Sequence, residues 1–474
     1  MKTSFTLQQL ADPAIADADA ILRSCEHFGF CTAGCPTYVL LGDENDAPRG
    51  RIDLIREMLE DGGAPKPKTV AHLDRCLSCM SCMTTCAIRV DYRHLIDRAR
   101  AHVETHHRRS WDERLVRALL AAVLPHPSRF RVALALAPIG RRALALAPAG
   151  LAARLRPLLA LAPATPPAPE PRVPGEHPAT APRRGRVLLL AGCAQRVLAP
   201  SINAATIRML NRAGFDVTVP PEAGCCGSLE LHMGREAPAM AAARANVRAW
   251  TAELGRGEVA AIVVNASGCG STVKDYGHLL KRDPVLADAA ARIGTLARDA
   301  CEFLAEVGLP DAPQPRRHVA AIHDPCSLRN VQRVTDAPRA LLAGAGFVLR
   351  EIPEAHFCCG SAGTYNLLEP EIARRLGERK AAHVAGTGAQ LVAAANVGCV
   401  VQIGAHSTLP VVHPVELLDW AWGGPRPAAL EGVVLDEVAA PVAAHTASGD
   451  ASATGPAGAP PSPADGGGAS SGFW

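Results

Sequence analysis

The tightest group of reactive side chains in this sequence is formed by Cys76, Cys79, Cys82 and Cys86. Their spacing, CxxCxxCxxxC, is typical of iron–sulfur proteins, because soft iron sites prefer thiolate ligands. Three closely spaced thiolates can surround one cluster from a loop, while the fourth points towards a neighbouring cluster. A zinc site is the alternative, and a second run of the same kind upstream favours iron.

The second cysteine run is the segment CEHFGFCTAGCP, which begins at Cys25. It contains Cys31, Cys35 and Pro36 at the positions that the same template requires. Phe28, however, occupies the position of the second cysteine. Because phenylalanine has no donor atom, one iron corner of this site is either missing, which gives a three-iron cluster, or carries water or another outside ligand.

Two-cluster ferredoxins exchange ligands between their runs, because the fourth cysteine of each run binds the other cluster. This rule divides the N-terminal cysteines into two sets. The first set is expected to hold a [4Fe-4S] cluster and consists of Cys35, Cys76, Cys79 and Cys82. The second set is expected to hold a [4Fe-4S] or a [3Fe-4S] cluster and consists of Cys25, Cys31 and Cys86.

An internal repeat accounts for most of the remaining cysteines. Two similar segments, PEAGCCGS from Pro221 and PEAHFCCGSAG from Pro353, each contain a Cys-Cys-Gly (CCG) motif. One cysteine lies 32 residues before the first cysteine of each motif, and another follows after an apolar segment. The two resulting quartets are Cys193, Cys225, Cys226 and Cys269, and Cys326, Cys358, Cys359 and Cys399.

Adjacent cysteines cannot both bind one metal with ordinary CxxC geometry, but they suit a cluster bound along one edge. Gly227 and Gly360 permit close approach of the backbone, and a following helix N-terminus favours thiolates. We therefore expect further iron–sulfur clusters at the quartets, with buried packing or a redox dithiol as alternatives. Cys301 belongs to neither quartet and is expected in the core. His323 and His356 are expected to support a cluster or the structure rather than bind iron.

The composition excludes some functional classes. The 474 residues include 49 lysines and arginines against 46 aspartates and glutamates, and the net charge of +3 argues against a nucleic-acid partner. The N-terminal segment lacks the apolar stretch of a signal peptide, and no apolar run is long enough for a membrane span. Glycine motifs for nicotinamide or flavin binding are also missing. We expect a cytoplasmic protein, with peripheral contact at the inner face of the cell membrane as a further option.

The segments that must position these cysteines form five predicted parts. Residues 1–110 predict a mainly helical, two-cluster ferredoxin-like domain. The arginine-rich residues 111–184 predict amphipathic helices followed by a proline-rich linker. Alternating apolar and helical patterns predict an α/β domain of two CCG repeats, at 185–310 and 311–424. Residues 425–474, rich in alanine, glycine, proline and serine, predict a disordered tail. The expected fold class is therefore α+β followed by α/β.

This combination resembles the iron–sulfur subunit of glycolate oxidase, also called glycolate dehydrogenase, over nearly residues 1–420. Segments that carry the resemblance include HLDRCLSCMSC, NAATIRML, VKDYG and CCGSAGTYNLLEPEIARRL. CCG units alone are less specific, since heterodisulfide reductases, anaerobic glycerol-3-phosphate dehydrogenase and lactate-utilisation proteins share them. The family pattern has cysteine where Phe28 stands and proline where Ala87 stands. Its CCG units often end in CxxC, whose first cysteine is replaced here by Ala266 and Asn396.

The resemblance implies an oxidoreductase subunit that has no catalytic residues of its own. Such a subunit receives electrons from FAD-containing glycolate oxidase subunits, which oxidise glycolate to glyoxylate, and passes them towards a membrane quinone. Three alternatives remain open. The chain could serve another flavin-linked dehydrogenase acting on lactate or glycerol 3-phosphate, the CCG domain could itself be catalytic as in heterodisulfide reductase, or the chain could be a zinc-stabilised scaffold.

Overall fold

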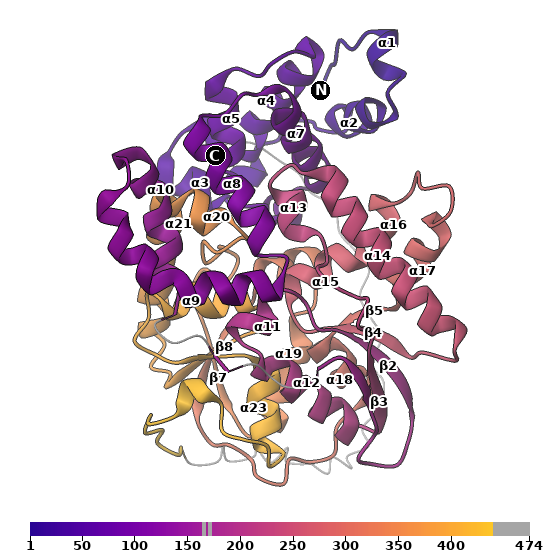
Figure 1. The fold of residues 1–474 in the computed structure, drawn as a ribbon, viewed down its shortest axis with the longest axis vertical. Coiled ribbons are helices and arrows are strands. Elements are labelled where there is room, and N and C mark those ends of the chain that lie inside the picture. Colours follow the sequence, from indigo (N-terminus) through magenta and orange to yellow (C-terminus); the bar gives the residue numbers. More distant parts are fainter. Residues whose placement is uncertain (164–166, 169–172, 439–474) are drawn as a thin grey trace, which may run out of the picture. The chain divides into compact units, whose positions relative to one another are not determined.

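The structure is a computed structural model that describes residues 1–163, 167–168 and 173–438. Figure 1 shows a helical N-terminal region, three helices that follow it, and helices packed on two β-sheets. This arrangement confirms the predicted fold class, a mainly helical region followed by an α/β region with two repeats.

Seven α-helices form the N-terminal region, and proline begins four of them. The N–H group at the first position of a helix makes no hydrogen bond within the helix, so proline, which lacks this group, is favourable there. Helices α2, α3, α4 and α5 each begin at a proline. The helices pack around fully buried residues such as Leu22, Ile55 and Leu95. They are α1 (Leu7–Leu10), α2 (Pro13–Arg23), α3 (Pro36–Leu41), α4 (Pro48–Asp61), α5 (Pro67–Asp74), α6 (Ser81–Thr85) and α7 (Tyr92–His106).

Three helices connect this region to the first sheet. Their inner faces bury Leu120, Phe130 and Leu134, while Leu136 and Ile139 on the outer face of the second helix are exposed. No described helix is long and apolar enough to cross a membrane. The three helices are α8 (Trp111–Val123), α9 (Pro127–Ala143) and α10 (Ala149–Leu161).

The first repeat is built on a five-stranded sheet with the order β1-β3-β2-β4-β5. All neighbours are parallel except β1, which pairs antiparallel with β3. The strands are β1 (Gly175–His177), β2 (Gly185–Leu190), β3 (Phe215–Val219), β4 (Ala261–Val264) and β5 (Ala297–Asp299). The helices are α11 (Gln195–Leu198), α12 (Ser201–Arg212), α13 (Ser228–His232), α14 (Glu236–Gly255), α15 (Ser267–Lys274), α16 (Tyr276–Leu279), α17 (Ala287–Leu296) and α18 (Ala300–Val307).

The second repeat is built on a four-stranded parallel sheet with the order β7-β6-β8-β9. The inner strands β6 and β8 are buried throughout, which explains why they read as continuous apolar segments. The strands are β6 (Val319–His323), β7 (Val348–Glu351), β8 (Leu391–Ala394) and β9 (Val411–Val412). A π-helix (Ser327–Gln332) follows β6, and the α-helices are α19 (Asp336–Gly344), α20 (Tyr365–Leu368), α21 (Pro370–Ala385), α22 (Val397–Gly404) and α23 (Pro414–Ala421).

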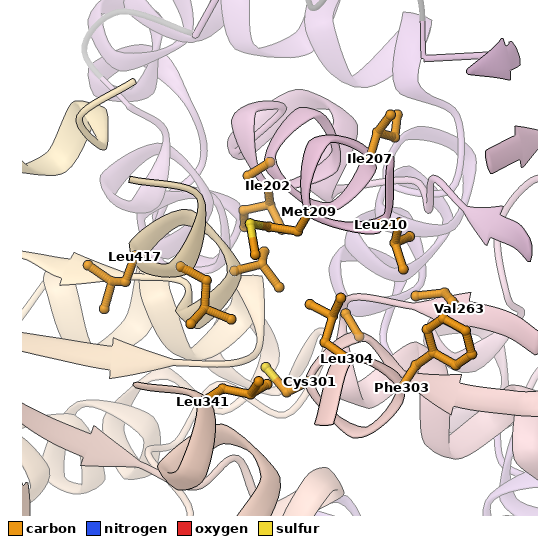
Figure 2. Close-up of a cluster of buried hydrophobic side chains, with 14 of the residues drawn as sticks. Ile202, Ile207, Met209, Leu210, Val263, Cys301, Phe303, Leu304, Leu341 and Leu417 are labelled. Carbon is orange, nitrogen blue, oxygen red and sulfur yellow. The ribbon is translucent and has the colours of Figure 1, made fainter. Parts of the chain in front are cut away.

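The two repeats share one apolar core. Helix α12 of the first repeat packs on α23 of the second, and α18 of the first packs on α19 of the second. Figure 2 shows side chains from these helices, among them Met209, Leu304, Leu341 and Leu417, gathered in this core. Cys301 lies among them and is fully buried, as expected for a cysteine outside the quartets.

Two segments at the edges of the predicted parts are folded with the repeats. Strand β1 lies inside the predicted proline-rich linker, so the first sheet begins before residue 185. Residues 425–438 contact the second repeat, because Leu430 is fully buried and the Val438 N–H donates to the Arg317 carbonyl at 2.8 Å. Only residues 439–474 remain for the predicted tail, and they lie outside the described residues.

Candidate iron–sulfur sites

The first N-terminal set is gathered around a small cleft. Its four thiols come from the residue before α3, the loop after α5 and the first turn of α6, and all four cysteines are buried. Ser78 and Met80 adopt left-handed backbone conformations, with φ of 49° and 56°, which turn this loop around the cleft. The structure thus brings together the predicted set of Cys35, Cys76, Cys79 and Cys82.

A cation and a hydroxyl group face these thiols. The Arg51 side chain is 1% exposed, and its Nη1 lies 3.9 Å from the Cys35 Sγ. The Tyr92 hydroxyl donates to the Cys76 Sγ at 3.6 Å. Burial raises the pKa of the Cys82 thiol, and the neighbouring thiols, Cys79 first, raise it further. Four buried thiols can ionise together only where additional positive charge is present, so the donor set fits an iron–sulfur cluster.

The second N-terminal set is also brought together. Burial raises the pKa of Cys31 to about 11, and the nearby thiols of Cys25 and Cys86 contribute to the shift. Phe28 lies 60% exposed, with its ring centroid 6.3 Å from that of Phe30, which is 62% exposed. The set therefore offers three thiols, and the residue at the fourth position projects largely into solvent.

In the first repeat, three different strand ends supply the quartet. Cys193 follows β2, the adjacent pair Cys225 and Cys226 lies between β3 and α13, and Cys269 lies in the first turn of α15. Hydrogen bonds from the thiols of Cys193 and Cys226 and from the Gly227 N–H lower the pKa of Cys225. Because the carboxyl ends of parallel strands meet at one edge of a sheet, these distant cysteines form one group.

The second repeat assembles its quartet in the same way. The Sγ atoms of Cys326 and Cys358 lie 3.8 Å apart, and Cys359 is linked by thiol contacts to Cys358 and Cys399. Gly360 has a φ of +93°, and a Cβ at this position would lie 2.7 Å from the Ala373 carbonyl oxygen. The glycine is therefore required by the turn and by the close approach of α21.

A histidine accompanies the second quartet. A ring nitrogen of His323 and the thiols of Cys359 and Cys399 all lie within 4.8 Å of one another. Neither ring nitrogen of His323 has a hydrogen-bond partner, and burial lowers its pKa to about 3, so the ring is neutral. A buried polar group without a partner is costly, and an iron ion would satisfy it. His356 is instead partly exposed and packs on Phe357, with the ring centroids 4.3 Å apart.

Sequence reasoning did not identify Arg51, Tyr92 and Lys380 as neighbours of the cysteines. Lys380 is 2% exposed and donates to the Glu354 carbonyl at 2.9 Å, close to the second quartet. These residues come from helices α4, α7 and α21, outside the cysteine motifs. The sequence offers one indication of their role, which is that a charged or polar side chain occurs on an otherwise apolar face of the helix.

The four cysteine sets form a continuous series. Cys31 is close enough to Cys82 to affect its pKa, which links the two N-terminal sets. The Asn330 amide donates to the Cys79 carbonyl at 2.9 Å, and Cys326 raises the pKa of Cys79. The second repeat in turn contacts the first, since the hydroxyl groups of Ser267 and Ser327 lie 2.8 Å apart.

Comparisons with known proteins agree with this division. Residues 24–91 match the family described as "4Fe-4S dicluster domain", which implies two iron–sulfur clusters. Residues 187–274 and 320–404 each match the family described as "Cysteine-rich domain".

Three curated relatives are similar over long stretches. The glycolate oxidase iron-sulfur subunit of Escherichia coli (strain K12) is 40% identical over 421 residues, which are 89% of this chain and 99% of that protein. The probable glycolate oxidase iron-sulfur subunit of Bacillus subtilis (strain 168) is 32% identical over 84% of this chain and 93% of its own. Lactate utilization protein A of Bacillus pumilus is 27% identical over 49% of this chain and 99% of its own. The chain therefore belongs to the family of glycolate oxidase iron–sulfur subunits, which are components of an oxidoreductase complex.

Proposed function

We propose that the chain carries electrons from a separate FAD-containing subunit, which oxidises glycolate to glyoxylate, towards a membrane quinone. The continuous series of four cysteine sets is the observation that supports this role. A structural metal needs only one set of ligands, whereas neighbouring sets allow electrons to pass from one cluster to the next through the protein. Relatives named as glycolate oxidase subunits in two bacteria support glycolate as the source of the electrons.

In this proposal the complete N-terminal set holds a [4Fe-4S] cluster, and the set of Cys25, Cys31 and Cys86 holds a [3Fe-4S] cluster. Each quartet of the repeats holds a further cluster. Bound clusters would accept and release single electrons. The Arg51 guanidinium and the Tyr92 hydroxyl offset negative charge on the sulfur ligands, and such contacts raise the reduction potential of a site.

We also propose that the outer face of α8–α10 rests on the inner face of the cell membrane. Exposed apolar side chains on this face include Leu136 and Ile139, and exposed arginines include Arg129, Arg141 and Arg142. No acidic residue occurs between Glu113 and Glu170 in the sequence. Such a face favours anionic lipid. Sedimentation with anionic but not with neutral vesicles is the expected result, and equal binding to both would reject the electrostatic part.

Anaerobic purification of the complete complex tests the electron-carrier role. Cys79→Ala is expected to remove the [4Fe-4S] signal from the reduced-state EPR spectrum and to lower quinone reduction by about 100-fold or more, while glycolate still reduces the flavin. Cys301→Ala is the matched control, because Cys301 is also buried but lies outside all four sets. An unchanged EPR spectrum in Cys79→Ala would reject the ligand assignment.

A further inference from the structure

A large apolar cavity lies between the three connecting helices and the two repeats. Its volume is about 560 Å³, within the range of small-molecule sites. One wall is formed by apolar side chains of α8, α9 and α10, among them Leu134, Leu155 and Leu158. The opposite wall contains cysteines of both quartets, including Cys193, Cys226, Cys359 and Cys399, so the proposed clusters would fill that end of the cavity and leave the leucine-lined end for another ligand.

The lining indicates the class of ligand. No lysine, arginine, aspartate or glutamate is among the described residues that line the cavity, and the polar groups are mainly serine hydroxyls and the side-chain amides of Gln195, Asn265, Asn366 and Asn396. The lining also includes His232, which faces the Asp97 carboxylate at 3.9 Å. A hydroxy acid such as glycolate would therefore find no unpaired cation for its carboxylate among the described lining residues, which is costly. An apolar, uncharged molecule with a few hydrogen-bonding oxygens suits the cavity.

We propose that this cavity is the quinone-binding site of the complex, an inference that rests on the proposed electron-carrier role. The leucine wall would hold the ring and the start of its apolar tail. The side-chain amides of Asn366 and Asn396 would donate to the quinone oxygens, because Gln195 and Asn265 already donate both amide hydrogens to other side chains. Reduction of one quinone to a quinol takes two electrons, which the oxidation of one glycolate to glyoxylate supplies. The two protons that the quinol gains come from solvent water.

The location of the cavity supports a membrane-derived ligand. Helix α9 carries Leu134 and Ala137 on its buried, cavity-lining side, and Leu136 and Ile139 on its exposed side. The same helix therefore separates the cavity from the face that we assign to the membrane. A quinone that moves from the membrane to the cysteine wall would therefore have to pass only the layer formed by helix α9.

Photoaffinity labelling of the wild-type complex with an azidoquinone tests the site without a mutation. The expected labelled peptides come from α9, α10 or the segment around Gln195, and excess short-chain quinone is expected to suppress the label. Label confined to another subunit, or label that excess quinone does not suppress, would overturn the proposal.

A substitution that fills the cavity provides a second test. Leu134→Trp is expected to lower the labelling and to raise the KM for a short-chain quinone by about 10-fold or more. Val285→Trp is the control, because Val285 is 81% exposed and does not line the cavity. Equal labelling and equal KM in a folded Leu134→Trp complex would contradict the assignment.

Cluster reduction separates this proposal from the one on which it rests. If glycolate fails to produce a reduced cluster signal in the wild-type EPR spectrum, the electron-carrier role is wrong. If the signal appears but the cavity peptides remain unlabelled, only the quinone site is wrong. Leu134→Trp is expected to keep the glycolate-reduced signal, since Leu134 contacts none of the N-terminal cysteines.

Discussion

The helical N-terminal region and the α/β region each contain two related cysteine sets, but the sets are assembled differently. In the helical region, short loops bring together cysteines from two compact runs. In the α/β region, each quartet is collected from strand ends that lie up to 76 residues apart, as between Cys193 and Cys269. In both regions one of the two copies has an altered residue. Phe28 removes a thiol and is exposed, whereas His323 adds a buried nitrogen beside a complete quartet.

This contrast shows where variation is tolerated. An exposed corner can lose a ligand because the iron at that corner can also be lost, which leaves a three-iron cluster, and the fold does not depend on that corner. His323 is buried, so solvent cannot take the place of its side chain if that side chain is lost. The equivalent end of β2 in the first repeat is Leu190, which is 1% exposed and lines the apolar cavity. The two repeats thus share a fold but present different surroundings to their cysteines.

The largest effect is expected from removing one cysteine in each repeat. Cys226→Ala and Cys359→Ala should both abolish quinone reduction. They should differ in the EPR spectrum after addition of glycolate, because the second quartet lies beside Cys79 and the first does not. Cys226→Ala should leave the second-repeat signal reducible, while Cys359→Ala should leave neither repeat reducible. The opposite pattern would reverse the order of the two repeats.

Exchanging the residue that distinguishes the repeats should have the next largest effect. His323→Leu is expected to change the EPR signal of the second quartet and to reduce quinone turnover by about 10- to 100-fold, the usual cost of losing a group that contacts a metal site. His323→Gln keeps hydrogen-bonding atoms at this position and should lose less. Identical spectra for His323→Leu and wild type would show that His323 only fills space.

Restoring the missing thiol at Phe28 tests the N-terminal half of the comparison, as the His323 substitutions test the other half. A [3Fe-4S] cluster is paramagnetic when oxidised, whereas an oxidised ferredoxin-type [4Fe-4S] cluster gives no EPR signal. Anaerobically prepared wild type is therefore expected to show a signal before reduction, and Phe28→Cys should convert it to one seen only after reduction. Phe30→Cys is the neighbouring control and should leave the oxidised signal in place. No oxidised signal in the wild type would contradict the three-iron assignment.

The smallest expected effect concerns the contact between the two regions. The ring nitrogens of His94 on α7 lie 2.5 Å from Asp91 and 3.1 Å from Asp275 of the first repeat. Burial opposes the charged form, but these hydrogen bonds raise the pKa of His94 to about 9, above its ordinary value of about 6.5. Its stabilising contribution, about 2 kcal/mol, is therefore complete below pH ~6.5 and is lost as the pH rises through about 9.

Thermal unfolding of the complex between pH 6 and pH 10 measures this contribution. Wild type should lose stability relative to His94→Gln as the pH rises, and the two should converge above about pH 9. A difference that does not change with pH would show that the ring contributes by packing on His278, whose centroid lies 3.4 Å away, rather than by charge.

Much of the fold and of the cysteine grouping could be predicted from the sequence. Motif spacing is a local property, so the two N-terminal sets could be proposed from the runs alone. The internal repeat identified the quartets, because the same spacing occurs twice. The amphipathic pattern of α8–α10 also predicted helices with one apolar face.

The remaining features depend on contacts between distant segments. Arg51 and Tyr92 reach the cysteines through the packing of α4 and α7, which no local pattern encodes. Strand β1 was not predicted, because its segment is rich in proline. The strand pairs with β3 at the edge of the sheet, where a nearby proline removes no hydrogen bond of the ladder. The cavity arises where three helices meet two repeats, so single-helix periodicity cannot reveal it.

The reciprocal packing of α12 on α23 and of α18 on α19 has a consequence for how the two repeats can diverge. Each helix of one repeat meets the non-equivalent helix of the other, which is the isologous arrangement of a two-fold symmetric dimer. A homodimer must carry the same residue at both symmetry-related positions. The two repeats are joined in one polypeptide, so they keep the geometry of such a dimer while their equivalent residues can differ. Histidine can therefore stand at the end of one central strand and leucine at the end of its counterpart.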